Sequence, residues 1–576
     1  MGKGIVKLGE GQWAVKDGNL LAAKETNGRF KNTEFTVTRG TDATYVGRDG
    51  LIKTASFYNL IPYSEDFSDS SWLKFATNLT ITPNAIISPT GQTDASKLVS
   101  GSTNAQQAIY RNITQSNCTL SVFAKKGEFD TIALKLSGSQ VSKFDLSDGT
   151  IGYNTNVTPS IESVGNGWYR CSITINSGSS AYAWIAIDTG NTQGDESSGI
   201  YIWGAQLVEG TETLDYQYTN GKEGMPRIDF TDNTDGHLLL EPESRNLIPY
   251  SEDFSSYTKS SIDLDDILVS SPSGSNIATG LTNATTAQCH VRTSFTTSST
   301  GNYTGTIYIK RQDFDYIYVE LGNAYARFDI LNGTKGASGQ FGTGWTYVNH
   351  DIETLSNGWF RISITANNTI TGTYNFRPYQ PTSTLFNYNS GSLGKSFIWG
   401  CQLEALPYPT SYIPTNGSQV TRDGEAVSRE SIDEIDIPQE EGTIYLELEG
   451  YEKNTEIFSF DRSTSNSIQI GTDNDGVLKV WAYYEPSGTG TVALVALNNN
   501  TRKVAIAFKN GSFIVYADGE EELNTSTFVW TPTDSIDRLY FNQGGYIASQ
   551  GLSKVKALRI YKEAFNTTQL DELTSL

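Results

Sequence analysis

The chain has 576 residues and a formal net charge of −22, with 64 acidic residues against 42 basic ones. Such a charge repels phosphate backbones, so we expect no nucleic-acid partner. No apolar run approaches the roughly 18 residues of a membrane span, and the first residues lack the core of a signal peptide. We therefore expect neither membrane insertion nor a secretory leader.

The composition is typical of short strands joined by many turns. Gly accounts for 54 residues, while charged residues make up only 18%. The 31 Tyr, 25 Phe and 10 Trp argue against disorder. A chain of this length accommodates about three to five domains. We predict an all-β, multidomain fold.

The N-terminal segment, residues 1–30, differs in composition from the rest. KGIVKLGEGQWAVKDGNLLAAKE (3–25) contains four Lys and neither Ser nor Thr. We predict that residues 1–30 form a separate docking segment, followed by a segment over 31–57 that leads into the first repeat.

The sequence NLIPYSEDFS occurs twice, beginning at Asn59 and again at Asn246. Four further motif pairs follow the two copies in the same order. A binding motif used twice would not bring these with it, so a module of about 160 residues has been duplicated. The pairs are LSVFAKKGEFDTIALKL (120–136) with TIYIKRQDFDYIYVEL (306–321), KFDLSDGTIG (143–152) with RFDILNGTKG (327–336), NGWYRCSIT (166–174) with NGWFRISIT (357–365), and IWGAQLVE (202–209) with IWGCQLE (398–404).

The motifs alternate apolar with polar residues, or are short aromatic runs that end at Gly, Asn or Asp. Segments of this kind, separated by turn signals, predict an antiparallel β-sandwich. We predict two such sandwiches, module 1 (58–220) and module 2 (246–415). We expect Trp168 and Trp359 to be buried anchors rather than ligand contacts.

The segments around the modules form a frame with specific motifs. These are TRGTDATYVGRDGLI (38–52), PRIDF (226–230), LLLEPESRNLIPYSEDF (238–254) and TSYIPTNGSQVTRDGEAVS (410–428). The frame resembles that of a family of tailed-bacteriophage virion proteins. In that family the DGLI and PRID motifs usually lie close together, whereas here residues 53–225 separate them. We interpret module 1 as an insertion into the frame, with linkers over 221–245 and 416–440.

The last part of the chain, 441–576, resembles a concanavalin-like (laminin-G-like) jelly roll. GTIYLELEG (442–450) and KVAIAFKNGSFIVYADGE (503–520) carry the resemblance, with KNGS and ADGE as hairpin turns. FNTTQLDELTSL (565–576) predicts a short capping helix with Asn566 or Thr567 as its N-cap.

The cysteines and histidines do not indicate a metal site or a catalytic triad. The cysteines lack metal-ligand spacing and lie at non-equivalent places in the repeats, which predicts free thiols in a chain made in a reducing cytosol. No histidine lies in a recognisable motif, so zinc and serine-triad chemistry are not expected. The residues are Cys118, Cys171, Cys289, Cys401, His237, His290 and His350.

The repeated carboxylates Glu65 and Asp66, with their copies Glu252 and Asp253, are candidates for acid chemistry or for Ca²⁺. Adjacent carboxylates on a strand point to opposite faces, so neither pair forms an acid–base dyad by itself. A Ca²⁺ site stays open, because carboxylates and loop carbonyls are its preferred ligands. The alternative is a charged start to an edge strand. For GTDNDG (471–476) we favour a turn over Ca²⁺, because the EF-hand spacing is missing.

AYAW (181–184) aligns with TYNF (373–376), which places Tyr182 with Trp184, and Tyr374 with Phe376, on one face of a strand. Sugars bind by stacking their C–H faces on flat aromatic rings, so an exposed pair would form a platform. The alternative is that these rings pack inside the sandwich, and the sequence does not separate the two.

The resemblance implies a non-enzymatic virion structural protein, a head or tail fibre or appendage subunit made in the host cytoplasm. It would attach to other virion proteins through residues 1–30, and its lectin-like modules would bind host-surface glycans. Since single shallow sugar sites are weak, we expect a homo-oligomer, by likeness to other phage fibres a trimer. One alternative is a purely structural decoration or connector protein. The other, a tailspike depolymerase, requires a spaced carboxylate pair or β-helix repeats, and the sequence shows neither.

Overall fold

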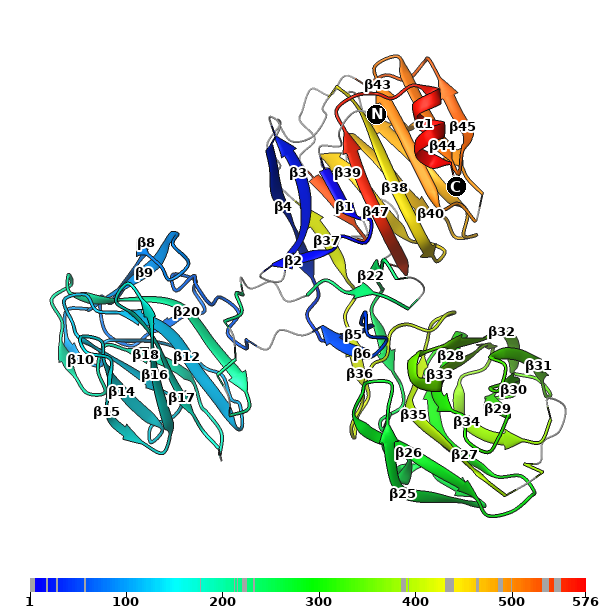
Figure 1. Cartoon of the computed structure of the whole chain (residues 1–576), viewed down its shortest axis with the longest axis horizontal. Helices are drawn as coiled ribbons and strands as arrows, with labels where there is room; N and C mark the ends of the chain where they lie inside the picture. Colours follow the sequence, from blue (N-terminus) through cyan, green and yellow to red (C-terminus); the bar gives the residue numbers. More distant parts are fainter. Residues whose placement is uncertain are drawn as a thin grey trace. The chain divides into compact units, whose positions relative to one another are not determined.

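The computed structural model (Figure 1) is an all-β protein, as the sequence predicts. Its described parts contain antiparallel strands, two single-turn 3₁₀ helices (Phe254–Ser256 and Ser356–Gly358) and one α-helix, α1 (Thr567–Thr574). The chain forms two compact units, unit 1 (1–56 with 224–576) and unit 2 (57–223). The structure describes residues 6–16, 19–26, 29–55, 59–176, 178–211, 213–214, 216–219, 225–231, 234–384, 390–391, 393–429, 440–462, 466–484, 491–498, 500–530, 538–542 and 551–575.

Module 1, in unit 2, is a sandwich of two six-stranded sheets around a core that includes Leu120, Ile132 and Ile185. Alternate residues of each strand face this core, which is why the motifs alternate. The first sheet has the order β15 (Thr150–Thr155), β14 (Val141–Asp145), β13 (Thr131–Lys135), β18 (Ala183–Ala186), β11 (Ala108–Arg111), β7 (Leu73–Lys74). The second has the order β16 (Thr158–Gly165), β17 (Trp168–Thr174), β12 (Cys118–Lys125), β20 (Gly199–Glu209), β9 (Thr93–Val99), β8 (Thr80–Ile87), and β10 (Asn104–Ala105) pairs separately with β19 (Thr192–Gln193).

Module 2, in unit 1, repeats this strand order. Its first sheet is β31 (Thr334–Gln340), β30 (Ala324–Asp329), β29 (Tyr316–Leu321), β34 (Gly372–Thr382), β27 (His290–Thr297), β24 (Thr258–Ser260). Its second is β32 (Trp345–Thr354), β33 (Trp359–Asn368), β28 (Gly301–Lys310), β35 (Lys395–Glu404), β26 (Asn276–Asn283), β25 (Ile262–Ser270). The predicted duplication of a sandwich is therefore confirmed.

The shared NGW motif opens the equivalent strands β17 and β33. In both copies Asn and Gly have positive φ, 53° and 75° at Asn166 and Gly167, and 59° and 75° at Asn357 and Gly358. Such values suit Asn-Gly in a tight turn. The following tryptophans are 1% exposed and donate to equivalent carbonyls, Trp168 to Ile87 and Trp359 to Ser270, both at 3.1 Å. They are buried anchors, as expected.

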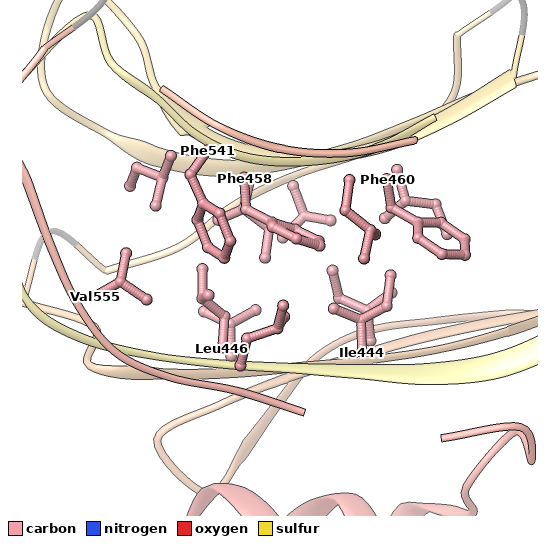
Figure 2. Packing of buried hydrophobic residues seen from close by; sticks show 14 of the residues in the cluster. Ile444, Leu446, Phe458, Phe460, Phe541 and Val555 are labelled. Carbon is pink, nitrogen blue, oxygen red and sulfur yellow. The ribbon is translucent and has the colours of Figure 1, made fainter. Parts of the chain in front are cut away.

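The third sandwich combines the C-terminal part of the chain with strands from the N-terminus and the frame. Figure 2 shows Ile444, Leu446 and Val555 of one sheet facing Phe458, Phe460 and Phe541 of the other. One sheet contains β38 (Glu441–Tyr451), β43 (Lys503–Lys509), β44 (Ser512–Ala517), β45 (Glu520–Thr525) and β47 (Ser553–Tyr561), joined by β1 (Val6–Gly9), β2 (Ala14–Lys16), β3 (Asn19–Thr26), β21 (Ile228–Asp229) and β22 (His237–Leu240). The other contains β4 (Arg29–Thr38), β37 (Ala426–Arg429), β39 (Glu456–Arg462), β40 (Asn466–Thr472), β41 (Leu478–Tyr484), β42 (Thr491–Ala496) and β46 (Arg538–Phe541).

The sequence predicts that residues 1–30 form a separate segment, and strand β1 corrects this part of the docking prediction. β1 pairs with β47 and β3, and its alternate residues Val6 and Leu8 are 4% and 3% exposed in the core of the third sandwich. Lys7, between them in the sequence, points outward. The third sandwich therefore includes N-terminal and frame strands, and residues 441–576 do not form it alone.

Helix α1 begins at the predicted N-cap. The Asn566 side chain accepts a hydrogen bond from the Gln569 amide at 3.0 Å, and the Gln569 side chain accepts one from the Asn566 amide at 3.0 Å. Leu570 and Leu573 of the helix are buried in a cluster with Tyr445.

The frame motifs meet in a buried ionic network. Arg227 donates to Glu241 at 2.8 Å and also to Glu425, which pairs with Arg39. Arg422 lies 3.5 Å from Glu241. All five side chains are at most 2% exposed. Burial opposes ionisation of Glu241, but Arg227 and Arg422 hold the pKa of this carboxyl at about 2, so the network stays charged.

Arg39 also holds the two ends of the inserted module. Its guanidinium donates to the Ala55 carbonyl at 2.8 Å and to the Met225 carbonyl at 3.2 Å. These residues lie on either side of unit 2 in the sequence. The remaining short frame strands are β5 (Ala43–Val46) with β6 (Ile52–Ala55), and β23 (Ser244–Asn246) with β36 (Val420–Arg422).

Candidate functional site

The outer face of the first sheet of module 1 carries a row of directly paired residues. Ile109, Leu134 and Ile185 of adjacent strands face the core. Residues next to them in sequence face outward, and Trp184 lies opposite both Tyr110 and Lys135. Lys135 in turn lies opposite Val141. We call Tyr110, Trp184, Lys135 and Val141 the outer row of module 1.

Trp184 is the centre of an aromatic cluster formed with Phe75, Tyr110 and Tyr182. The ring centroids of these three residues lie 5.0, 4.8 and 5.3 Å from that of Trp184. The Tyr110 ring is stacked on Trp184 at an interplanar angle of 25°. Trp184 is 6% exposed, whereas Phe75 is 54% exposed. The cluster therefore offers an exposed ring that is supported from behind by packed aromatics.

Polar groups lie beside the aromatic cluster. The Lys135 ammonium lies 5.7 Å from the centre of the Trp184 ring and donates at 3.0 Å both to Gln106 Oε1 and to the Thr189 carbonyl. Burial lowers the pKa of Lys135. Within the described residues, the Trp184 indole N–H is buried and has no hydrogen-bond acceptor. An apolar ring face beside such donors suits a ligand with both C–H faces and hydroxyl groups.

The equivalent row of module 2 is largely charged. Glu320 occupies the position of Lys135 in the aligned motifs and lies opposite Arg377 and Tyr325. Arg292 of β27 lies across a bulge from Arg377. Arg377 Nη1 donates to Glu320 at 2.7 Å and to Gln380 Oε1 at 3.3 Å. We call Arg292, Arg377, Glu320 and Tyr325 the outer row of module 2.

Aromatic rings continue this row towards the edge strand β31. Tyr325 lies between Tyr318 and Phe341, with centroid distances of 5.7 and 4.8 Å and interplanar angles of 23° in both pairs. The Arg327 guanidinium lies 5.6 Å from the Tyr318 ring centre and 5.5 Å from that of Tyr325. Phe341 is 45% exposed. We call Tyr318, Tyr325 and Phe341 the aromatic ladder.

The predicted counterparts of the Tyr182–Trp184 pair do not lie on this outer face. Phe376 is 0% exposed in the core of module 2, and Tyr374 packs against the same core, 5.1 Å from Trp345 between ring centres. The sequence alignment is one residue out of register, because Arg377 is the residue equivalent to Trp184. A shift of one residue moves a side chain to the opposite face of a strand. Phe376 is therefore an interior residue and Tyr374 is partly buried against the same core, so the two do not form the predicted exposed platform.

The repeated carboxylates serve the chain's internal hydrogen bonding. Glu65 accepts from the Tyr216 hydroxyl at 3.0 Å, and Glu252 accepts from Tyr412 at 2.9 Å. Asp66 accepts from the Ser68 amide at 3.0 Å, and Asp253 from the Ser255 amide at 2.9 Å. These equivalent bonds account for the verbatim repetition.

The rest of NLIPYSEDFS has equivalent structural contacts in both modules. The Asn59 side chain donates to the Ala205 and Gln217 carbonyls at 3.1 and 2.8 Å. The Asn246 side chain donates to the Cys401 and Ile413 carbonyls at 3.2 and 2.9 Å. We call the motif a clamp, because its asparagine joins the first segment of each module to later segments of the same module by hydrogen bonds.

The part of the chain that the structure describes contains no group of three or more His, Cys, Asp or Glu side chains arranged to hold a metal ion. In GTDNDG, Asp473 accepts from the Asp475 and Val477 amides at 3.0 and 2.9 Å, the geometry of a turn. All four cysteines are buried free thiols, as predicted, and burial raises the pKa of Cys118 to about 11 and that of Cys401 to about 12. In the described residues no helix is both long and apolar enough to cross a membrane.

Unit 1 also contains a cavity of about 410 Å³ with several acidic residues in its lining. Glu241 belongs to the buried ionic network, Asp229 accepts from the Val46 amide at 2.7 Å, and Glu353 lies 3.7 Å from Arg361. Glu452 also lines the cavity, and burial raises the pKa of its carboxyl. A second hollow, of about 440 Å³, is bordered by Glu252 and Asp253.

No known protein family and no curated protein matches the sequence. Among solved structures, the CBM40 of the Ruminococcus gnavus IT-sialidase bound to α2,3-sialyllactose is similar over 24% of this chain and 84% of its own, with 13% identity and a TM-score of 0.20. Domain 4 of AbnA, a GH43 extracellular arabinanase from Geobacillus stearothermophilus in complex with arabinotriose, is similar over 29% and 82%, with 15% identity and a TM-score of 0.21. The Trypanosoma rangeli sialidase in complex with sialic acid is similar over 96% and 76%, with 9% identity and a TM-score of 0.18. Similarity at this level concerns the β-rich fold alone.

Proposed function

We propose that this chain is a non-enzymatic saccharide-binding protein and a fibre or appendage subunit of a tailed-phage virion. In this proposal module 1 holds a sugar ring of a host-surface glycan against the aromatic cluster. The observation that carries the saccharide part is this cluster, in which exposed Phe75 packs on Trp184, and Trp184 in turn packs against Tyr110 and Tyr182 on the outer face of one sheet.

The chemistry of the cluster supports a saccharide more than a flat apolar ligand. A sugar presents one C–H face that stacks on an aromatic ring and hydroxyl groups that need hydrogen-bond partners at its rim. The unpartnered Trp184 indole N–H, the Tyr182 hydroxyl and the Lys143–Asp188 pair (2.6 Å) provide polar groups on the same face. A purely apolar ligand would leave the Trp184 indole N–H without a partner.

The virion part of the proposal rests on the frame motifs alone. The structure gives these motifs a physical reason. Each frame motif contributes at least one residue to the buried ionic network, which consists of Arg39, Arg227, Glu241, Arg422 and Glu425. A purely structural connector protein would use the same frame. Mass spectrometry and immunogold labelling of purified phage particles test the assignment, and absence of the chain from particles would overturn it.

Glycan-array binding of the full chain tests the saccharide part. We expect that Phe75→Ala and Tyr182→Ala each weaken the best neutral-glycan signal about tenfold, since one stacked ring is worth about 0.5–1.5 kcal/mol. Tyr153→Ala is the matched control, because Tyr153 is a 59% exposed aromatic of the same module outside the cluster. No glycan signal, or equal loss in the control, would reject the proposal. Release of reducing ends from a bound glycan would instead indicate an enzyme.

A further inference from the structure

The outer row of module 2 differs chemically from the aromatic cluster that occupies the same place in module 1. We propose that this row, with the aromatic ladder beside it, binds an acidic oligosaccharide, with Arg292 and Arg377 holding a sugar carboxylate. The inference rests on the proposed saccharide function and deepens it, because it assigns acidic glycans to module 2 and neutral ones to module 1.

The first argument is the state of the two arginines. Arg292 is half-buried on the outer face and has neither an ion-pair nor a hydrogen-bond partner among the described residues. Arg377 uses Nη1 for Glu320 and Gln380, and its Nε is buried without an acceptor. An arginine with unused donors in a partly buried site favours a planar anion that accepts two parallel hydrogen bonds.

The second argument is that the carboxylate of the row is already paired with Arg377. Glu320 is the acidic residue of the row; it pairs with Arg377 at 2.7 Å and interacts with Arg292 through its charge alone. Burial raises the pKa of Glu320, although Arg377 opposes this effect. His290 lies on the same face of β27, and burial together with Arg377 and Arg292 lowers its pKa to about 4. The imidazole is thus neutral at pH 7 and supplies a hydrogen-bonding group without adding charge.

The third argument is the position of the aromatic ladder. Tyr325 lies directly opposite Glu320, and the Tyr318 hydroxyl donates to Glu320 at 3.4 Å, so the ladder adjoins the arginines on one sheet face. Tyr325 also lies opposite Gly339 of the edge strand. A Cβ on Gly339 would come within 2.9 Å of the Tyr325 hydroxyl oxygen, so the missing side chain leaves room for this ring. A saccharide stacked on the exposed Phe341 ring would therefore extend along this face towards the arginines.

The test is binding of the full chain to an array of paired glycans. Each pair holds an oligosaccharide containing a uronic or sialic acid and the same oligosaccharide with its carboxylate reduced to an alcohol, and sulfated neutral glycans form a third group. We expect at least one acidic glycan to bind about tenfold better than its reduced form. Arg292→Gln should remove this difference, and Phe341→Ala should weaken both members of the pair.

The matched control is Arg311→Gln, because Arg311 is an exposed arginine of module 2 that pairs with Asp315 outside the row. It should leave the acidic preference unchanged. Increasing NaCl should weaken acidic binding and leave the neutral binding of module 1 nearly constant. The inference is overturned if no acidic glycan outperforms its reduced partner, if only sulfated glycans do, or if the preference survives Arg292→Gln.

These outcomes are distinct from failure of the proposed function of module 1. Phe75→Ala reports on the neutral signal alone, whereas Arg292→Gln reports on the carboxylate preference alone. A chain that binds acidic glycans through Arg292 but is unaffected by Phe75→Ala would retain the inference and lose the site proposed for module 1.

Discussion

Module 1 and module 2 have the same strand order and the same NLIPYSEDFS clamp, but different outer rows. The identical residues are those whose side chains make internal hydrogen bonds, such as Asn59 and Asn246. The residues that differ, such as Trp184 and Arg377, point away from the core. A side chain on the outer face of a sheet does not help to hold the two sheets together, so this face can change its chemistry while the sandwich is retained.

The comparison agrees with the interpretation of the verbatim repeat as part of a duplicated module. Glu65 and Glu252 each accept a hydrogen bond from an equivalent tyrosine within the module. Binding specificity would lie instead where the copies disagree. The frame adds a second difference, since module 2 is continuous with the ionic network in unit 1 whereas module 1 is an insertion.

The largest effect is expected from breaking the ionic network. This should lower the free energy of unfolding of unit 1, which contains module 2, and leave that of unit 2, which contains module 1, unchanged. Glu425→Ala leaves Arg39 and Arg227 buried without their shared carboxylate, which should cost unit 1 about 3–5 kcal/mol. Hydrogen-exchange mass spectrometry in denaturant should show lost protection in unit 1 and none in 57–223. Lys53→Ala removes an exposed pair with Asp49 (2.7 Å) and should cost less than about 1 kcal/mol. Equal loss of protection in both units would contradict the assignment.

A smaller effect is expected at the two outer rows. Trp184→Ala removes a ring packed by three others and should destabilise unit 2 by about 3 kcal/mol. Arg377→Ala removes an ion pair whose partners are each 21% exposed and should cost unit 1 about 1–2 kcal/mol. Denaturant midpoints of the single variants measure both. A Trp184→Ala variant as stable as the wild type would show that the aromatic cluster is not packed as described.

The stability of the two units should also differ in its response to acid, because every histidine of the chain lies outside module 1. Burial and the neighbouring arginines lower the pKa of His290 from 6.5 to about 4, and burial lowers that of His350. Between pH 6.5 and 4 the unfolded chain then binds more protons than the folded one, so the stability of unit 1 should fall as the pH falls. Glu320, whose pKa is raised, offsets part of this loss. An NMR titration of the imidazole signals checks the cause, and a His290 midpoint near 6.5 would refute it.

The sequence predicts the sandwiches because their signals are local. Strand alternation, the NGW turns and the Asn566 cap each depend on residues that are close in the chain. The outer rows are not predictable in this way. β34 pairs irregularly with both of its neighbours, at bulges near Arg377. Motif spacing therefore does not show which residue of β34 is equivalent to a given residue of β18 in module 1. This is why motif spacing aligns Trp184 with Phe376 instead of Arg377.

The N-terminal strand and the frame network show a second limit of local reasoning. β1 pairs with β47, more than 500 residues later in the chain, and no local pattern indicates which edge a short strand will join. Arg39 and Glu425 each lie in a motif that reads as a polar loop. Their charges are buried because the motifs meet in space, and pairing of that kind is a tertiary property.

The smallest effect is expected from the largest change, removal of module 1 itself. Arg39 donates to the carbonyls of both Ala55 and Met225, so the two ends of the insertion are held by one guanidinium. A short Gly-Ser linker in place of 57–223 should therefore close the frame without strain, and unit 1 should keep its denaturant midpoint and its hydrogen-exchange protection. Arg39→Lys in the shortened chain is the matched test of the clamp, because an ammonium cannot reproduce the forked geometry that reaches Glu425 and both carbonyls. We expect that variant, and not the deletion, to be destabilised. If the deletion alone unfolds unit 1, module 1 is a structural part of the frame. The interpretation of module 1 as an insertion would then be wrong.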